Sequence, residues 1–138
     1  ASNDLLDMFE DMRFGSMLQK LRYEDPARFG EKEVFRMATE GGAKAMGLNA
    51  GRIEAGKLAD LILVDCTAVT MAPLHDPISA LVYCGKSCDV ETVLINGRVV
   101  MKDRVICTVP EAEKVREAVA LGEDRLAEVS GGPLASQF

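Results

Sequence analysis

The stretch GRIEAGKLADLILVDC, residues 51–66, decides how the rest of the chain is interpreted. Its Gly-Lys pair superficially matches a phosphate-binding loop, but Leu58 follows the pair where the Walker motif needs Ser or Thr. The stretch also precedes an apolar run, whereas a phosphate-binding loop follows a strand and opens a helix. We therefore expect Gly51 and Gly56 to be turn residues that lead into a buried strand over residues 61–64.

Length and composition are those of an ordinary folded domain. Of the 138 residues, 48% are apolar and 28% are charged, close to the average for globular proteins. The 22 acidic residues outnumber the 16 basic ones, and a net charge of -6 argues against binding to nucleic acid or to an anionic membrane surface. The sequence lacks a long apolar run and begins with an acidic, amphipathic segment, so the expected compartment is the cytoplasm.

The first helix is predicted from Asp4 to Arg22. Ser2, Asn3 and Asp4 are all competent N-caps, and the acidic residues that follow suit the positive end of the helix dipole. The apolar positions cover more than a narrow stripe, so this helix needs burial on a broad front. Its acidic residues have the spacing of a solvated helix face rather than of paired catalytic carboxylates.

A second helix is predicted over residues 31–47, with Gly47 placed just past its last turn. Gly41 and Gly42 lie in the second half of this helix. Glycine in a helix interior costs about 1 kcal/mol relative to alanine. The pair therefore indicates that another segment approaches the helix closely at this point.

The second half of the chain changes to extended periodicity. Asn96-Gly97 separates two β-rich runs and predicts a hairpin, and a second tight turn is expected over residues 102–104. Asp76-Pro77 predicts the N-cap and the first residue of a short helix. Two helices followed by strands and a final helix make an α+β arrangement.

The last helix has the clearest pattern. Thr108 and Glu111 form a capping box, with Pro110 in the first turn. Apolar or small residues then recur at spacings of three and four, which predicts a docking helix with one apolar face. These residues are Ala112, Val115, Val119, Gly122, Leu126 and Val129.

The sequence offers little chemistry of its own. His75 is the only histidine, and a zinc or iron site needs several ligands from separate elements, so we predict neither metal ligands nor catalytic residues in this chain. His75 is expected to be a loop residue, and no serine lies in a G-x-S-x-G motif. The four cysteines lack metal-binding spacing and are expected to be reduced and mostly buried.

Three segments, in order, resemble one enzyme superfamily. GRIEAGKLADLILVD matches the pattern G-x-I-x-x-G-K-x-A-D-L-x-x-x-D, which lies near the C-terminal end of amidohydrolase-superfamily enzymes. Residues 1–20 resemble the stretch after the eighth barrel strand of the deaminase and chlorohydrolase branch, and residues 73–106 are similar to its closing hairpin region. Within that branch the chain looks most like the S-adenosylhomocysteine and methylthioadenosine deaminases.

The resemblance implies a fold in which a composite β-sandwich is appended to a metal-dependent (β/α)8 barrel. Residues 1–49 would be the last helices of the barrel, and residues 50–108 the C-terminal sandwich strands with a crossing loop. Residues 109–130 would be a docking helix and residues 131–138 a tail. The strand over residues 61–64 would be covered on both faces in the intact enzyme.

The resemblance also implies a function whose chemistry lies elsewhere. Family members bind zinc or iron through histidines and an aspartate of the barrel, and the activated water attacks a purine- or triazine-like ring carbon that carries an amino or halide leaving group. None of those ligands matches a residue of this chain, which would begin just after the last of them. Ser2 and Asn3 would lie at the mouth of the barrel, adjacent to the substrate.

The implied partners are the remainder of the hydrolase, with its barrel and N-terminal sandwich strands, and a second copy in a homo-oligomer. We expect this segment to bind no metal and to be inactive alone, with an exposed sheet edge and an uncovered face. One alternative stays open. The chain could be a non-catalytic structural or interaction module, either as a degenerate paralogue or as one half of a split enzyme.

Overall fold

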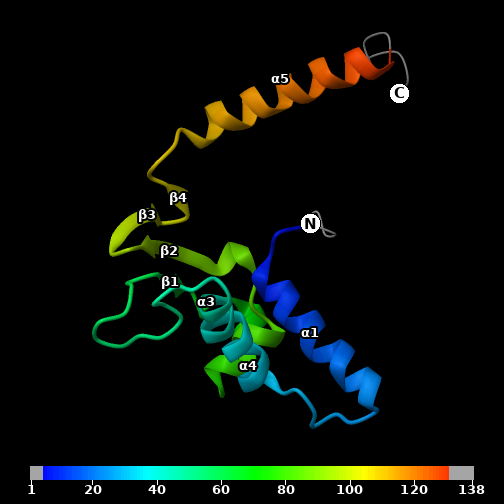
Figure 1. Cartoon of the computed structure of the whole chain (residues 1–138), viewed down its shortest axis with the longest axis vertical. Helices are drawn as coiled ribbons and strands as arrows, with labels where there is room; N and C mark the ends of the chain where they lie inside the picture. The colour runs from blue at the N-terminus through cyan, green and yellow to red at the C-terminus, as the bar shows by residue number, and fades with distance from the viewer. Residues whose placement is uncertain (1–4, 131–138) are drawn as a thin grey trace. The chain divides into compact units, whose positions relative to one another are not determined.

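The computed structural model describes residues 5–130, with side chains for residues 5–128. The chain divides into two compact units, Ala1–Arg104 and Val105–Phe138. The first unit combines helices with an antiparallel sheet, which confirms the α+β class (Figure 1). Its elements are α1 (Met8–Tyr23), α2 (Glu31–Arg36), the π-helix η1 (Met37–Gly41), α3 (Gly42–Ala45), β1 (Leu61–Val64), the 3-10 helix η2 (Val69–Met71), α4 (Pro77–Tyr83), the 3-10 helix η3 (Ser87–Asp89), β2 (Val90–Ile95) and β3 (Arg98–Lys102).

Helix α1 begins later than the sequence predicts. The N-cap is Asp7, whose carboxylate accepts hydrogen bonds from the backbone N–H groups of Phe9 (2.9 Å) and Glu10 (3.4 Å). The predicted start at Asp4 is wrong, because capping by Asp7 places two further acids in the first turn, where the helix dipole favours them. Burial raises the pKa of the Asp7 carboxyl, but hydrogen bonds from Phe9 and Ser87 outweigh burial and hold that pKa below its usual value.

Helices α2, η1 and α3 form one continuous helical run, as the sequence predicts. The run ends at Gly47, whose φ is +68°. The backbone N–H of Gly47 donates to the carbonyl of Lys44, and that of Leu48 donates to the carbonyl of Ala43. These two bonds are a Schellman motif, so the predicted role of Gly47 is confirmed.

The prediction for Gly41 and Gly42 is wrong. The nearest neighbours of a Cβ at either position would be atoms of Arg36 and Met37, at 3.6 Å or more, and both residues belong to the same helical run. The two glycines lie where the wider π-helical turn of η1 returns to an α-helix. Among the described residues, no atom of another element comes nearer to either Cβ position than these atoms do.

The sheet is antiparallel, with β2 paired to both β1 and β3. The β2–β3 hairpin turns at Asn96 and Gly97, whose φ angles of +50° and +75° suit a two-residue type I′ turn. Asp103 and Arg104 follow β3 with φ angles of +51° and +63°. Both predicted turns are confirmed.

Strand β1 pairs with β2 in the register that sets Leu61 opposite Leu94. The predicted strand is confirmed, but its predicted burial is not found, because Ile62 and Leu63 are 52% and 51% exposed. Neighbouring residues of a strand point to opposite faces, so β1 is half-open on both. Within residues 5–130, β1 has a strand partner on one side only, as expected for a sheet with an open edge.

The core of the first unit lies between α1, α2 and α4, which pack against one another. Val34 of α2 and Val82 of α4 are fully buried, and Phe9 and Met12 of α1 lie beside them. These residues come from three separate elements. Burial of this cluster therefore ties the N-terminal helices to the segment that precedes β2.

A polar contact joins the same helices. The fully buried hydroxyl of Ser16 donates to the carbonyl of Phe29 (2.9 Å) and lies 3.0 Å from the hydroxyl of Tyr83. The Tyr83 hydroxyl also accepts a hydrogen bond from Lys20 Nζ (2.7 Å). Because a buried hydroxyl without a partner would cost about 1–3 kcal/mol, this chain of hydrogen bonds restricts how α1 and α4 can pack.

The second unit contains β4 (Val105–Ile106) and α5 (Glu111–Ser130). The predicted cap at Thr108 is wrong, because the carbonyl of Pro110 accepts the first helical bonds, from the N–H groups of Glu113 and Lys114. The residue before a proline is disfavoured in the helical conformation, so Val109 does not extend the helix towards Thr108. Neither α5 nor any other helix within residues 5–130 has the length and apolar character needed to cross a membrane.

Val34→Ala is expected to lower the free energy of unfolding by about 2 kcal/mol, since it removes two methyl groups from a fully buried site. Val69→Ala is the matched control, because Val69 is 92% exposed, and its effect should stay within about 0.5 kcal/mol. Urea denaturation followed by circular dichroism measures both. Equal losses in the two variants would contradict the assigned core.

Candidate functional site

The residues predicted as site candidates do not form one site. Ser2 and Asn3, predicted to lie near a substrate, fall outside the described residues. His75 is exposed in a loop, as predicted. The next residue, Asp76, caps α4 by accepting a hydrogen bond from the N–H of Ser79 (2.9 Å), which confirms the predicted cap.

The prediction of mostly buried cysteines is wrong. Cys66 and Cys84 are half-buried, whereas Cys88 and Cys107 are exposed. All four are free thiols, as predicted. They lie in short turns or at the ends of elements, where the chain reaches the surface, and not on the helix faces that form the core.

The described residues do not fit a metal centre. Residues 5–130 contain no group of three or more His, Cys, Asp or Glu side chains that could hold a metal ion. A zinc site needs three or four such ligands. The zinc or iron that the resemblance implies would therefore have to be held by residues outside 5–130. Residues 5–130 are given no part in a metal-assisted step.

The signature stretch, residues 51–66, instead begins with a loop. Asn49 holds the two ends of this loop together. The Nδ2 of Asn49 donates to the carbonyl of Gly56 (2.9 Å), and its Oδ1 accepts from Lys57 Nζ (2.8 Å). The N–H of Leu58 donates to the carbonyl of Asn49 (2.8 Å). The signature lysine is thus bonded to an amide oxygen within its own loop. Asn49 was not predicted, although an amide side chain just after the helix-ending glycine is a signal for such closure.

Gly51 brings this loop against the π-helix η1. Its φ is +85°, and a Cβ at this position would lie 2.7 Å from the carbonyl oxygen of Thr39 and 2.9 Å from the Cα of Glu40. The next residue, Arg52, pairs with Glu40 at 3.3 Å. A close approach to this helical run therefore exists, but the glycine that permits it belongs to the loop. The predicted turn conformation is also confirmed, because Gly56 has a φ of +88°.

The two signature acids bind opposite ends of the hairpin. Asp60, just before β1, accepts a hydrogen bond at Oδ1 from the N–H of Asn96 (2.7 Å) in the hairpin turn. Asp65, just after β1, pairs at Oδ2 with Arg104 Nη2 (3.0 Å) beyond the other end of β3. Asp60 and Asp65 directly flank the strand, one on each side. In addition, each carboxylate fastens β1 to the β2–β3 hairpin.

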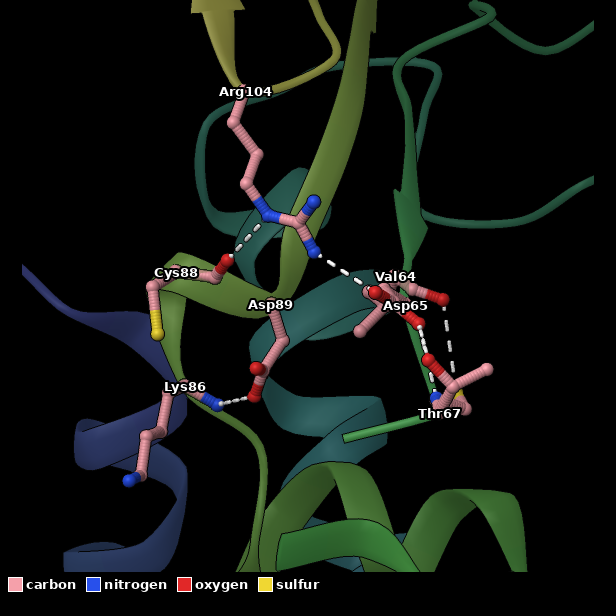
Figure 2. A network of polar contacts seen from close by, with 8 residues as sticks. Val64, Asp65, Thr67, Lys86, Cys88, Asp89 and Arg104 are labelled. Atoms are coloured by element: carbon pink, nitrogen blue, oxygen red, sulfur yellow. Dashed lines mark hydrogen bonds and ion pairs between the residues drawn. The ribbon is translucent and has the colours of Figure 1, made fainter. Parts of the chain in front are cut away.

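Figure 2 shows Asp65 at the centre of a polar network. Its Oδ1 accepts hydrogen bonds from the hydroxyl (2.6 Å) and the backbone N–H (3.0 Å) of Thr67. Arg104, which pairs with Oδ2, also donates from Nε to the carbonyl of Cys88 (3.0 Å). The backbone N–H of Asp65 donates to the carbonyl of Asp89 (2.8 Å). Because both carboxylate oxygens already accept hydrogen bonds, the network holds the backbone in place and leaves Asp65 unsuited to act as a base.

Gly51→Ala is expected to destabilise the chain more than Gly56→Ala. The positive φ at both positions strains an alanine by about 1–2 kcal/mol. Only at Gly51 would the new Cβ collide with backbone, whereas nothing lies within 4 Å at Gly56. We expect losses in urea unfolding of about 3 kcal/mol and about 1 kcal/mol, respectively. If the two variants lose the same stability, the contact with η1 does not hold the loop.

In Asp65→Asn, the stability of the fold is expected to decrease less than in the parent chain as the pH is lowered. Hydrogen bonds from Thr67, and then the contact with Arg104, lower the pKa of the Asp65 carboxyl from 3.8 to about 2. A carboxyl group whose pKa is lower in the folded state stabilises the fold above its unfolded pKa, and this contribution is lost as the pH falls to the folded pKa. The urea midpoint of the parent chain should therefore fall between pH 3.8 and about pH 2.

The matched control is Asp124→Asn, since the side-chain carboxylate of Asp124 makes no hydrogen bond or ion pair within the described residues. This control should keep the acid profile of the parent. The pKa of Asp7 is also lowered, so part of the fall in the urea midpoint should remain in Asp65→Asn. Parallel profiles for all three proteins would contradict the role of Asp65.

Comparison with known proteins identifies the family of this chain. The model of the Amidohydrolase family matches residues 1–100. The chain is 47% identical, over 119 residues, to a 5-methylthioadenosine/S-adenosylhomocysteine deaminase of Pelotomaculum thermopropionicum. That alignment covers 86% of this chain and 28% of the relative.

Solved structures point to the same family. A zinc-bound adenosine deaminase from Xanthomonas campestris matches with a TM-score of 0.83 and 33% identity, over 88% of this chain and 28% of the other. An atrazine chlorohydrolase from Arthrobacter aurescens, complexed with zinc, matches with a TM-score of 0.75 and 25% identity, over 82% and 26%. The chain spans less than a third of the length of these relatives. Since the family model matches most of its length, the chain belongs to the amidohydrolase family.

Proposed function

We propose that this chain is a supporting segment of a metal-dependent hydrolase that removes the amino group from an adenosine-type nucleoside. The observation that carries the proposal is the 47% identity to the Pelotomaculum deaminase. Because the chain spans 28% of that relative, the activity and the substrate class are proposed for a whole enzyme. The described residues would contribute architecture to it.

The proposed assignment within such an enzyme follows the family pattern. Residues 1–49 would supply the last helices of a (β/α)8 barrel, residues 50–108 sandwich strands with a crossing loop, and residues 109–130 a docking helix. Helices followed by an antiparallel sheet in Ala1–Arg104 support this order. In this assignment, the bonds of Asp60 and Asp65 keep the sandwich strands in register.

The proposed partner is the remainder of the hydrolase, with its barrel and N-terminal sandwich strands. Leu6, just before α1, is 87% exposed, and Leu21, within α1, is 75% exposed. Ile62 of β1 is 52% exposed at the edge of the sheet. Exposed large apolar side chains are typical of a surface that another part of a protein covers.

The proposed metal is zinc, because the adenosine deaminase and the atrazine chlorohydrolase structures described above both contain it. Iron, which the resemblance also implies, has no comparable support. The ligands of the proposed zinc would come from outside residues 5–130, since those residues contain no group of side chains suited to hold a metal ion.

A second candidate is displacement of chloride from a triazine, which the TM-score of 0.75 with the atrazine chlorohydrolase supports. Its lower identity of 25%, against 47% for the deaminase, places it second. The other alternative is a non-catalytic module, as a degenerate paralogue or as one half of a split enzyme. The exposed apolar side chains of α1 and β1 are compatible with that alternative as well.

A chimera tests the proposal. This chain replaces the aligned 119 residues of the Pelotomaculum deaminase, and ammonia release from 5-methylthioadenosine is measured. We expect a folded, zinc-containing chimera whose kcat/KM lies within about tenfold of the parent enzyme, since only supporting residues change. Atrazine serves as the competing substrate and should not lose chloride.

Two controls belong to this experiment. The chimera with Gly51→Ala should be less stable and less active than the chimera with Gly56→Ala, because only the first change disturbs the contact with η1. The isolated chain, assayed beside them, should release no ammonia. A folded, zinc-loaded chimera without turnover would overturn the proposed role, and turnover with stoichiometric zinc in the isolated chain would overturn the proposed location of the metal.

A further inference from the structure

The turn of the β2–β3 hairpin carries a pair of residues that can react with each other. Asn96 and Gly97 are both exposed, and the side-chain amide of Asn96 makes no hydrogen bond within residues 5–130. An asparagine followed by glycine is prone to deamidation, because glycine has no side chain to hinder attack by its backbone nitrogen. Asn49, by contrast, precedes Ala50, and both polar atoms of its side chain are hydrogen-bonded.

Deamidation of such a pair consumes only water. The Gly97 nitrogen loses its proton and bonds to Cγ of Asn96, the Cγ–Nδ2 bond breaks, and Nδ2 leaves with that proton as ammonia. Water then opens the five-membered imide that remains. Opening at Cγ leaves an aspartate, whereas opening at the main-chain carbonyl leaves an isoaspartate, whose backbone is one carbon longer. Both products carry a new negative charge in place of the amide.

The folded turn keeps the reacting atoms apart. Asn96 has a φ of +50°, and a residue in this left-handed region has a ψ of about +47°. That ψ places the Gly97 nitrogen on the side of the Cα–C bond away from Cβ, whereas ring closure needs both atoms on the same side. The N–H of Gly97 also donates to the carbonyl of Ala59 (3.0 Å). The reaction therefore requires the turn to open first.

The segment just before β1 holds the turn closed. The backbone N–H of Asn96 donates to Oδ1 of Asp60 (2.7 Å), beside the bond between Gly97 and Ala59. A hydrogen bond to a charged acceptor is stronger than one to a neutral carbonyl. Of the two contacts, the one with Asp60 is therefore the more important for keeping the turn closed.

We propose that Asn96 is a deamidation site whose rate is set by Asp60, and that its deamidation releases the start of β1 from the hairpin. The rate follows the fraction of chains in which the turn has separated from residues 59–60. An isoaspartate lengthens the backbone between the two N–H groups that bind residues 59 and 60, and an aspartate brings a second carboxylate near Asp60. The proposal goes beyond the proposed function and does not depend on it, since it concerns only the hairpin and β1.

Peptide mapping of the 138-residue chain tests the proposal. The chain is incubated in mildly alkaline buffer and digested with trypsin, and conversion of the amide to a carboxylate is followed by mass spectrometry. The tryptic peptide of residues 87–98 contains Asn96 as its only asparagine, and the peptide of residues 45–52 contains Asn49 as an internal control. Deamidation at Asn96 should be at least about tenfold slower in the folded chain than in urea. Deamidation at Asn49 should stay below that at Asn96 in urea.

Three variants test the role of Asp60. Asp60→Ala should speed deamidation of the folded chain at least about fivefold, because the turn opens more often. Asp60→Asn, which keeps an oxygen acceptor without the charge, should give a rate between those of the parent and Asp60→Ala. Asp65→Ala is the matched control, since it removes the carboxylate at the other end of β1, which binds Arg104, and should change the rate less than about twofold. In urea all four proteins should react equally fast.

Four results would each overturn the proposal. Equal rates in the folded chain and in urea would show that the turn gives no protection. If neither Asp60 variant reacts faster than the parent, or if Asp65→Ala reacts as fast as Asp60→Ala, Asp60 does not set the rate. Deamidated chains, separated from the parent by anion exchange, should have a lower urea midpoint, and an unchanged midpoint would contradict the release of β1.

Discussion

Strand β1, which has a strand partner on one side only within residues 5–130, is held in place by a carboxylate at each of its ends. Asp60 binds the backbone of the hairpin turn, and Asp65 binds Arg104 beyond the opposite end of the hairpin. Between them, the ladder of β1 and β2 is short and interrupted by a shift in register. Because both ends of β1 are fixed, the loop that leads into it and the loop that leaves it have defined starting points. The two acidic residues of the stretch 51–66 thus fix both ends of β1 to the β2–β3 hairpin.

The parts of the fold that the sequence predicts are those with local causes. Asn96-Gly97 predicts its hairpin because few other residue pairs accept two positive φ angles, and Gly47 predicts a helix end for the same reason. Asp76 before Pro77 predicts a cap from two neighbouring residues. In each case the residues that decide the conformation are adjacent, so one sequence is sufficient.

The parts that sequence reasoning missed depend on residues far apart in the chain. The glycines of the helical run suggested a close approach, but the contact is made by Gly51, on the segment that approaches. Burial of β1 depends on what covers it, and an apolar run contains no such information. The helix starts at Met8 and Glu111 were missed because several residues could cap each helix, and choosing among them requires the neighbouring backbone. Arg104 was missed as the partner of Asp65, since 39 residues separate them.

The shape of the loop before β1 is determined at its two ends and does not depend on which residues form its tip. Asn49 and Lys57 hold the two sides together, while Ile53 at the tip is 91% exposed. The residues that determine the path of the backbone are therefore not the ones that solvent meets. Loop tips of this kind tolerate inserted residues, because the ends of an insertion remain close together. The stretch between Arg52 and Gly56 is accordingly a position at which a peptide tag or a fluorescent label can be introduced without disturbing the sheet.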